Sequence, residues 1–471
     1  GEWSGTSKLN KYDLSSMYFN YAGSIYSQNF PIIDIVMNTM LKQEESTQGR
    51  HFFRMFNGMG DDQRAASYLN GKSFEQAVLD NTLSTEVFYE MMKLKGVYLR
   101  NYINSRLSSN EFKEFMAEFM KKYQFQEVNF TRLNSEFIRK FHFNLMDFIP
   151  NWYTINSTPR FIVKGVDADQ VEIGDYTKYI VKFQVYNPTN VEGVISVNVE
   201  EGGGMFPGGP RGRRGRAAQM ESKPAKNYII EPRKYKEIRI LCDERPSNLT
   251  INTNISQNLP STIMQNFAKV TTTTTDTVTG IFDSNAALFT FNPKEITVDN
   301  EDPGFRIIES NQKNKLQSFF KKESEDKYKN LNFWMPPSKW TATIGVNYYG
   351  DYINSAVYKK SGSGSNKTEW TTQIQIPGFY EVFVYTSELP MMGWRRRGSE
   401  EKKMQYYTVK HDDGEEEISV ETGRGRQGWM TLGSFYFSAG EAKITLSDKG
   451  SESNQIIFAD AVKWVYTNNN K

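Results

Sequence analysis

The stretch from Trp370 to Tyr385 constrains the fold more than any other part of this chain. Apolar and aromatic residues alternate with polar ones there, on both sides of a Pro377-Gly378 break. A period of two places one set of side chains on a buried face, and Pro-Gly interrupts a strand, so the stretch predicts two β-strands. The alternation returns at residues 433–437 and 443–446. The C-terminal part is therefore expected to be a β-sandwich of short antiparallel strands.

Four separated phrases in this part also carry a family resemblance. They are residues 296–305, 370–385, 428–437 and 458–464, the last reading Phe458-Ala-Asp-Ala-Val-Lys-Trp464. Together they resemble the golvesin C-terminal or xanthan lyase-associated domain, a jelly-roll module appended to secreted bacterial enzymes. The resemblance implies an accessory module and brings no catalytic chemistry with it.

Length and composition limit the remaining possibilities. A chain of 471 residues is too long for one hydrophobic core. Lys and Arg number 57 against 55 Asp and Glu, so no overall charge recruits nucleic acid. No apolar stretch is long enough to form a membrane span. The one cysteine, Cys242, lies in an alternating segment, which predicts a buried strand thiol and excludes a disulfide within the chain.

The first third has helical signals. Ser73 with Gln76, and Ser108 with Glu111, have the spacing of capping boxes. Phenylalanines and methionines recur at helical spacing over residues 112–120, and phenylalanines and Leu133 do so over 130–141. Proline residues 150 and 159 then end the helical pattern. These stripes predict a helical core.

This helical segment resembles the second half of the catalytic domain of gluzincin aminopeptidases of the aminopeptidase N type. The resemblance rests on Lys95-Gly96, expected to open a helix, on the helix from Glu111, on residues 122–125 and on residues 148–153. It implies a peptidase-like chain whose β-domain follows the helices.

The catalytic parts of that family are missing. Its zinc ligands come from a His-Glu-x-x-His helix, whose spacing turns both imidazoles toward the metal. His51, His142 and His411 are the three histidines of this chain, and no two are four residues apart. Lys93 stands where the family has its oxyanion-stabilising tyrosine. We therefore predict no catalytic residues, no metal site and no cofactor in this chain, with zinc only if an upstream domain exists.

Short strands follow the helices at residues 161–166, 179–186, 193–199, 228–230, 237–242 and 249–255. Six strands over this length predict an Ig-like sandwich. The threonines at 271–275 fit either a linker or a strand. The expected fold class is multidomain α + β: a helical domain at 1–157, an Ig-like β-sandwich at 158–270 and a C-terminal jelly-roll β-sandwich at 271–471.

Arginine clusters and acidic stretches are the candidate ligand sites. The Gly- and Arg-rich residues 202–216 predict a long mobile loop, with binding of nucleic acid or of an acidic polysaccharide as the alternatives. Arginine beside tryptophan can hold an anionic sugar by ion pairing and stacking. The candidate residues for such a clamp are Trp394, Arg395, Arg396, Arg424, Arg426 and Trp429. Residues 299–302 and 411–415 lack calcium-loop spacing, which favours solvated turns over calcium sites.

Two functions remain open from the sequence. One is the non-catalytic C-terminal portion of a gluzincin-type, peptidase-like protein, secreted or in the envelope, with an accessory module. The other is a standalone envelope protein that binds carbohydrate through the golvesin-like domain. The expected partner is a polysaccharide or a peptide, and the expected location is secreted, periplasmic or cell-envelope. Upstream sequence would separate the two, since a His-Glu-x-x-His segment there would indicate the peptidase.

Overall fold

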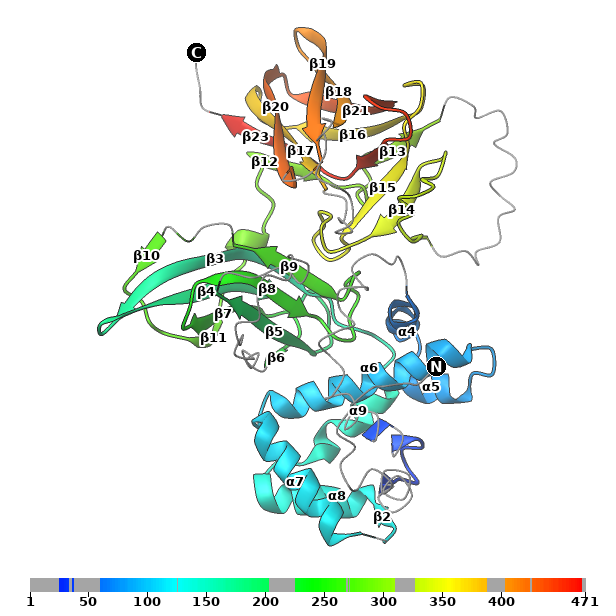
Figure 1. Ribbon diagram of the computed structural model, residues 1–471, viewed down its shortest axis with the longest axis vertical. Coiled ribbons are helices and arrows are strands. Elements are labelled where there is room, and N and C mark those ends of the chain that lie inside the picture. Colours follow the sequence, from blue (N-terminus) through cyan, green and yellow to red (C-terminus); the bar gives the residue numbers. More distant parts are fainter. Residues whose placement is uncertain are drawn as a thin grey trace, which may run out of the picture.

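The protein has three structured parts that follow one another along its longest axis (Figure 1). The computed structural model describes residues 25–33, 36–37, 60–124, 126–202, 225–267, 270, 272–309, 327–387, 403–423 and 426–467. Helices lie at one end, a β-sandwich lies in the middle, and a second β-sandwich lies at the other end. The Gly- and Arg-rich segment lies almost entirely outside the described residues.

The helical part begins with capped helices, as the sequence predicts. Both predicted capping boxes, at Ser73 and at Ser108, are present. The elements are β1 (Ile25–Tyr26), α4 (Asp61–Tyr68), α5 (Phe74–Leu79), α6 (Thr85–Asn104), α7 (Ser109–Lys122), β2 (Val128–Asn129), α8 (Phe130–Phe141), the 3-10 helix η2 (Leu145–Asp147) and α9 (Ile149–Thr154). Phe112, Phe115 and Phe137 are buried in one shared core, so the aromatic stripes are core residues.

Two details of the helical prediction are wrong. Lys95-Gly96 does not open a helix but lies in the middle of α6, because Ser84 caps that helix by accepting a hydrogen bond from the backbone N–H of Val87. Pro150 does not end the helical pattern, since it lies in the first turn of α9. A proline is tolerated there because the first N–H groups of a helix have no partner within the helix.

The middle sandwich consists of two sheets. One has the order β10-β3-β4-β7-β11 and the other β6-β5-β8-β9. The strands are β3 (Ile162–Ile173), β4 (Tyr176–Tyr186), β5 (Gly193–Glu201), β6 (Lys226–Ile230), β7 (Tyr235–Cys242), β8 (Pro246–Asn252), β9 (Thr262–Asn266), β10 (Thr272–Thr274) and β11 (Gly280–Asp283). Cys242 is fully buried on β7, as predicted.

The expected domain boundary between residues 270 and 271 is wrong, because strands that follow it belong to the sheets of the middle sandwich. Strand β10 pairs with β3 and strand β11 pairs with β7, so both complete the middle sandwich. Residues Thr272–Thr274 of the threonine run therefore form a strand and not a linker. Thr is a good strand former, and an open sheet edge on β3 was available to pair with it.

The C-terminal sandwich has the sheets β12-β23-β17-β20 and β13-β16-β21-β18-β19, with a smaller sheet β14-β15-β22 beside them. Its strands are β12 (Glu295–Val298), β13 (Phe305–Ile308), β14 (Thr341–Ile344), β15 (Ser355–Lys360), β16 (Lys367–Ile374), β17 (Gly378–Thr386), β18 (Lys403–His411), β19 (Gly414–Thr422), β20 (Gly428–Phe437), β21 (Gly440–Gly450), β22 (Ile456–Ala459) and β23 (Val462–Thr467), after a 3-10 helix η3 (Ala287–Phe289). The two strands predicted on either side of Pro377-Gly378 are confirmed as β16 and β17. They lie in opposite sheets, so this turn crosses the core.

A loop of the C-terminal sandwich also contacts the middle sandwich. The backbone N–H of Leu259 donates to the carbonyl of Tyr352 at 2.9 Å, and the N–H of Asn354 donates to the carbonyl of Leu259 at 2.7 Å. The Arg160 guanidinium lies 4.0 Å from the centre of the Tyr352 ring. These contacts hold the loop before β15, which contributes to the site described next.

Candidate carbohydrate-binding face

Strand β17 is aromatic on both faces. Tyr380 and Val382 point into the sandwich core and are 0% exposed. Phe379, Phe383 and Tyr385 alternate with them and so lie on the outer face of the sheet. A solvent-facing position of an antiparallel sheet is normally polar, so aromatic residues at three of them need another explanation.

The strand register places further rings beside these three. Phe379 pairs with Tyr436 and Tyr385 pairs with Trp429 across β17 and β20. The ring centres of these two pairs are 5.4 Å and 5.3 Å apart. We call the following set the aromatic face: Tyr349, Phe379, Phe383, Tyr385, Trp429 and Tyr436.

Tyr349 reaches this face from the loop that precedes β15. Its ring centre lies 5.1 Å from that of Trp429 and 5.7 Å from that of Tyr385. It also shares a side-chain hydrogen bond with Thr297 of β12. Burial raises the pKa of Tyr385 to about 12 and raises the pKa of Tyr349 as well, so both phenols stay protonated at neutral pH. Tyr385 likewise shares a side-chain hydrogen bond, with Gln427.

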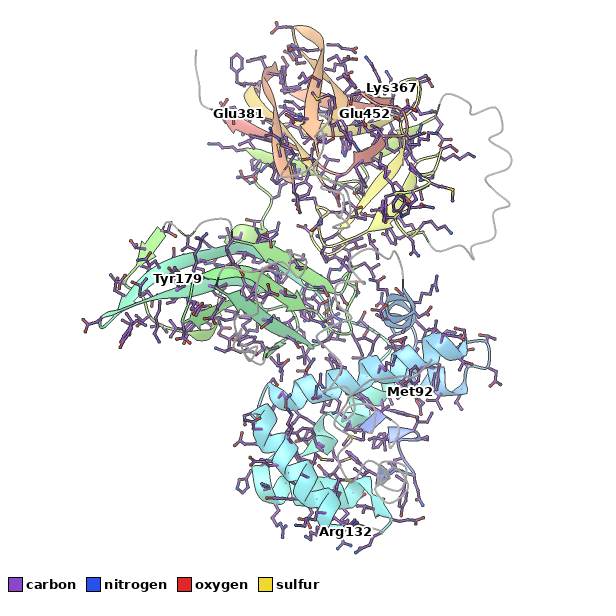
Figure 2. The ribbon with its side chains drawn as sticks, viewed as in Figure 1. Met92, Arg132, Tyr179, Lys367, Glu381 and Glu452 are labelled. Atoms are coloured by element: carbon purple, nitrogen blue, oxygen red, sulfur yellow. The ribbon has the colours of Figure 1, made fainter. Side chains whose placement is uncertain are left out.

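The aromatic face is most exposed at its Phe379–Tyr436 end and carries few charges. Phe379 is 38% exposed and Tyr436 is 37% exposed. Lys463 of β23 lies between the rings, with its ammonium 4.6 Å from the centre of Trp429, and it pairs with Glu295 at 3.4 Å. The sheet that carries the face consists of β12, β23, β17 and β20. Glu381, labelled in Figure 2, is the other charged residue at an outward position of these four strands. One lysine beside two glutamates gives this face no net positive charge.

The face is long enough for a polymer. Phe379 and Tyr385 are six positions apart on one strand, which corresponds to about 20 Å. The sheet offers a surface and not an enclosed cavity. Such a surface can contact several consecutive units of an extended chain.

The structure tests the predicted arginine–tryptophan clamp only in part. Trp394, Arg395, Arg396 and Arg424 lie outside the described residues. Arg426 is exposed and pairs with Glu421 at 3.3 Å. Trp429 belongs to the aromatic face, and the cation over its ring is Lys463. The other aromatic residues of the face were not predicted, because the alternation of β17 indicates one buried face and says nothing of the opposite one. The available signal was that aromatic residues occupy both odd-numbered and even-numbered positions of that strand, and therefore both of its faces.

Both acidic stretches form turns, and the prediction of solvated turns holds fully for one of them. Residues 411–415 form an exposed hairpin turn between β18 and β19, as predicted. Residues 299–302 form a turn that is solvated only in part, because Asp302 is exposed but Asp299 is only 7% exposed. Burial and the neighbouring carboxylates Asp302 and Glu301 raise the pKa of Asp299 to about 8. Within the described residues, no group of three or more His, Cys, Asp or Glu could hold a metal ion.

A second polar site lies between the helical part and the middle sandwich. Lys95 is 3% exposed and donates a hydrogen bond to the carbonyl of Trp152, whose indole donates back to the carbonyl of Lys95 at 3.3 Å. Burial lowers the pKa of Lys95 to about 7. The adjoining pocket, also lined by Glu192 and Thr158, holds about 40 Å³. This volume accommodates water molecules and is too small for a sugar ring.

Comparison with known proteins supports the C-terminal resemblance. Residues 329–466 match the Golvesin C-terminal domain family, a segment that contains the whole aromatic face. No curated protein sequence matches the chain. No helix in the described part of the chain is long and apolar enough to cross a membrane.

Solved structures give only weak likenesses. Paenibacillus xanthan lyase aligns at 14% identity and a TM-score of 0.26, covering 66% of this chain and 26% of the lyase. An exo-β-1,3-galactanase of Phanerochaete chrysosporium aligns at 15% identity and a TM-score of 0.18, covering 28% of this chain and 27% of that chain. The chain thus spans about a quarter of the length of either enzyme. At these TM-scores the likenesses carry no argument about function.

The peptidase resemblance finds no support in these comparisons. The residues that suggested it have structural roles, since Lys95 and Trp152 bond to each other inside the helical core. Lys93, at the position of the family's tyrosine, pairs with Glu90 at 2.6 Å. The C-terminal segment is golvesin-like, and the part before it is helices followed by a β-sandwich.

Proposed function

We propose that this protein binds polysaccharide through the aromatic face of its golvesin-like module, and that it does so outside the cytoplasm as a secreted or envelope protein. The observation that supports the proposal is the row of aromatic side chains on the outer face of β17 and β20. Ordinary strand chemistry would place polar residues at those positions. Aromatic rings there offer apolar surface for the C–H faces of sugars.

The charges of the face favour a neutral polysaccharide. An anionic sugar would need a cation without its own partner, and Lys463 is already paired with Glu295. Glu381 adds a further negative charge beside the rings. A neutral chain that lies along β17 meets no such repulsion. This differs from the anionic sugar expected from the arginine clusters, most of which lie outside the described residues.

The test is titration of the full chain with neutral and acidic polysaccharides by calorimetry or affinity electrophoresis. Phe379→Ala and Trp429→Ala should each weaken binding about tenfold, the factor that corresponds to about 1.4 kcal/mol. Tyr176→Ala is the matched control, because Tyr176 is 73% exposed on the middle sandwich, away from the face.

Two results would contradict the proposal. One is unchanged affinity in both face variants while binding itself is measurable. The other is binding that requires an acidic glycan and disappears at high salt, since that dependence indicates ion pairing. A binding site on the arginine clusters would then replace the aromatic face.

A further inference from the structure

Two buried carboxyl groups lie beneath one end of the aromatic face. Asp299 is 7% exposed and Asp460 is 2% exposed. Val298 pairs with Val462 at the end of the β12–β23 ladder, which brings the residue after β12 close to the residues before β23. Burial raises the pKa of both carboxyl groups, and the negative charge of Asp299 raises the pKa of Asp460 further. They therefore form a pair.

The pair has hydrogen-bond partners but no counterion within the described chain. Asp460 accepts from the backbone N–H of Tyr349 at 3.2 Å and 3.3 Å, one distance for each oxygen, and from the hydroxyl of Ser387 at 3.2 Å. Asp299 accepts from the N–H of Asn300 at 2.8 Å. No described Lys, Arg or His forms an ion pair with either carboxyl group. Two buried carboxylates without a cation repel each other strongly, and one retained proton removes that repulsion.

Asp460 links the acidic pair to the aromatic face through Tyr349. The same residue whose N–H bonds to Asp460 places its ring against Trp429 and Tyr385. The Ser387 hydroxyl lies within hydrogen-bond distance of both Asp460 and the carbonyl of Asn347, at 3.2 Å and 3.3 Å. The loop that carries Tyr349 is thus fixed from below by Asp460.

We propose that the buried pair of Asp299 and Asp460 retains one proton and that Asp460 is a positioning residue for Tyr349, so that the aromatic face binds polysaccharide best while the pair keeps its proton. This inference rests on the proposed function for its ligand and on the buried pair for its mechanism. Asp460 itself touches no ligand in this arrangement. Its role is to hold the ring that does.

The surroundings of the pair determine the direction of the pH effect. Glu301 is paired with Lys327, and Asp351 is paired with Lys164 at 3.5 Å, so both of these lysines already have partners. The other titratable groups that face the pair are Asp302, Tyr328, Tyr348, Tyr349, Tyr385 and Tyr407, and burial raises the pKa of each of them. The five tyrosines among them are neutral in the folded protein over the range in which the pair loses its proton. A raised carboxyl pKa means that the folded state binds more protons than the unfolded state, so stability falls as pH rises toward about 8.

The first experiment needs no sugar. Thermal unfolding of the full chain is followed from about pH 5 to about pH 9, the range that brackets the expected proton loss. The unfolding temperature of the golvesin-like module should fall with rising pH, and Asp299→Asn should flatten the fall and melt higher than the wild type at the alkaline end. Asp413→Asn, in an exposed turn of the same module, is the control and should follow the wild type. An Asp299→Asn profile with the wild-type slope overturns the proposal of a retained proton. So does calcium that raises the alkaline melting temperature of the wild type but not of Asp299→Asn, because the pair would then hold a cation.

The second experiment tests the positioning role. Neither Asp460→Asn nor Asp460→Ala can titrate at this position, but Asp460→Asn keeps an acceptor for the Tyr349 N–H and Asp460→Ala does not. Hydrogen–deuterium exchange of the peptide that contains Tyr349 should stay slow in Asp460→Asn and become fast in Asp460→Ala. Polysaccharide affinity should follow the same order, with a loss of about two- to tenfold in Asp460→Ala, the effect of one displaced aromatic contact. Equal exchange in the two variants overturns the positioning role whether or not a polysaccharide binds. The expected difference in exchange between the two variants, together with no measurable polysaccharide binding, would count against the proposed function alone.

Discussion

Replacing Lys95 with methionine should stabilise the protein at neutral pH and destabilise it at alkaline pH. The side chain is 3% exposed between the rings of Phe74 and Trp152, and its ammonium has one hydrogen-bond acceptor, the carbonyl of Trp152. Burial lowers its pKa from 10.5 to about 7. The folded state therefore binds fewer protons than the unfolded state between these two values. Stability contributed by this site rises as pH rises through that window.

The magnitude follows from the size of the shift. A difference of about 3.5 pKa units corresponds to at most about 5 kcal/mol, most of which opposes folding at neutral pH. Methionine removes this penalty but leaves the carbonyl of Trp152 without its partner, which costs about 1–3 kcal/mol. The Lys95→Met variant should gain about 1–3 kcal/mol at neutral pH. Above the unfolded-state pKa the penalty is gone, so the variant should be less stable by about 1–3 kcal/mol.

The assay is urea unfolding monitored by the helical circular dichroism signal at several pH values. The stability curves of the wild type and Lys95→Met should cross between neutral and strongly alkaline pH. Lys121→Met, an exposed position of α7, should run parallel to the wild type throughout. A Lys95→Met variant that is less stable by the same amount at every pH would refute the reasoning, because Lys95 would then keep one protonation state across the window.

Three further outcomes follow from single contacts. Lys359→Met should lower the stability of the golvesin-like module by about 3–5 kcal/mol in thermal unfolding, because it leaves Asp448, 0% exposed, as a buried charge without its ion-pair partner. Cys242 should react with a thiol reagent only in denaturant, since its side chain is fully buried on β7. Gly350→Ala should lower both the melting temperature and the polysaccharide affinity. A Cβ at Gly350 would meet the carbonyl oxygen of Ile353 at 1.9 Å, where φ is +154°, so the loop carrying Tyr349 would have to move.

Local patterns predicted the elements well because they depend on nearby residues only. The capping boxes at Ser73 and Ser108 formed as expected, since a cap is complete within four residues. The alternation on either side of Pro377-Gly378 located β16 and β17, since the side chains of a strand alternate whatever its partners are. Cys242 was placed correctly by the same reasoning.

The pairing of the strands could not be predicted in this way. Alternation does not say which sheet a strand joins, so the crossing of the core between β16 and β17 and the addition of β10 to β3 came only from the structure. The aromatic face could not be predicted for the same reason, because it depends on which strands are neighbours in the sheet. Trp429 and Lys463 are far apart in the sequence, and only the order β23-β17-β20 brings them together. Charge and composition near Trp429 indicated arginine as its cation, whereas the sheet supplies lysine.

Asp299 and Asp460 are far apart in the sequence, but the fold buries them together. Asp299 follows β12 and Asp460 precedes β23, and each would be a surface carboxylate on an isolated strand. Antiparallel pairing of β12 with β23 buries both, and the loop of Tyr349 covers them by donating its N–H to Asp460. That loop is held from its other end by Leu259 of the middle sandwich. Because the same short loop contacts the acidic pair, the aromatic face and the neighbouring sandwich, a change at any one of these three places should be felt at the position of the Tyr349 ring.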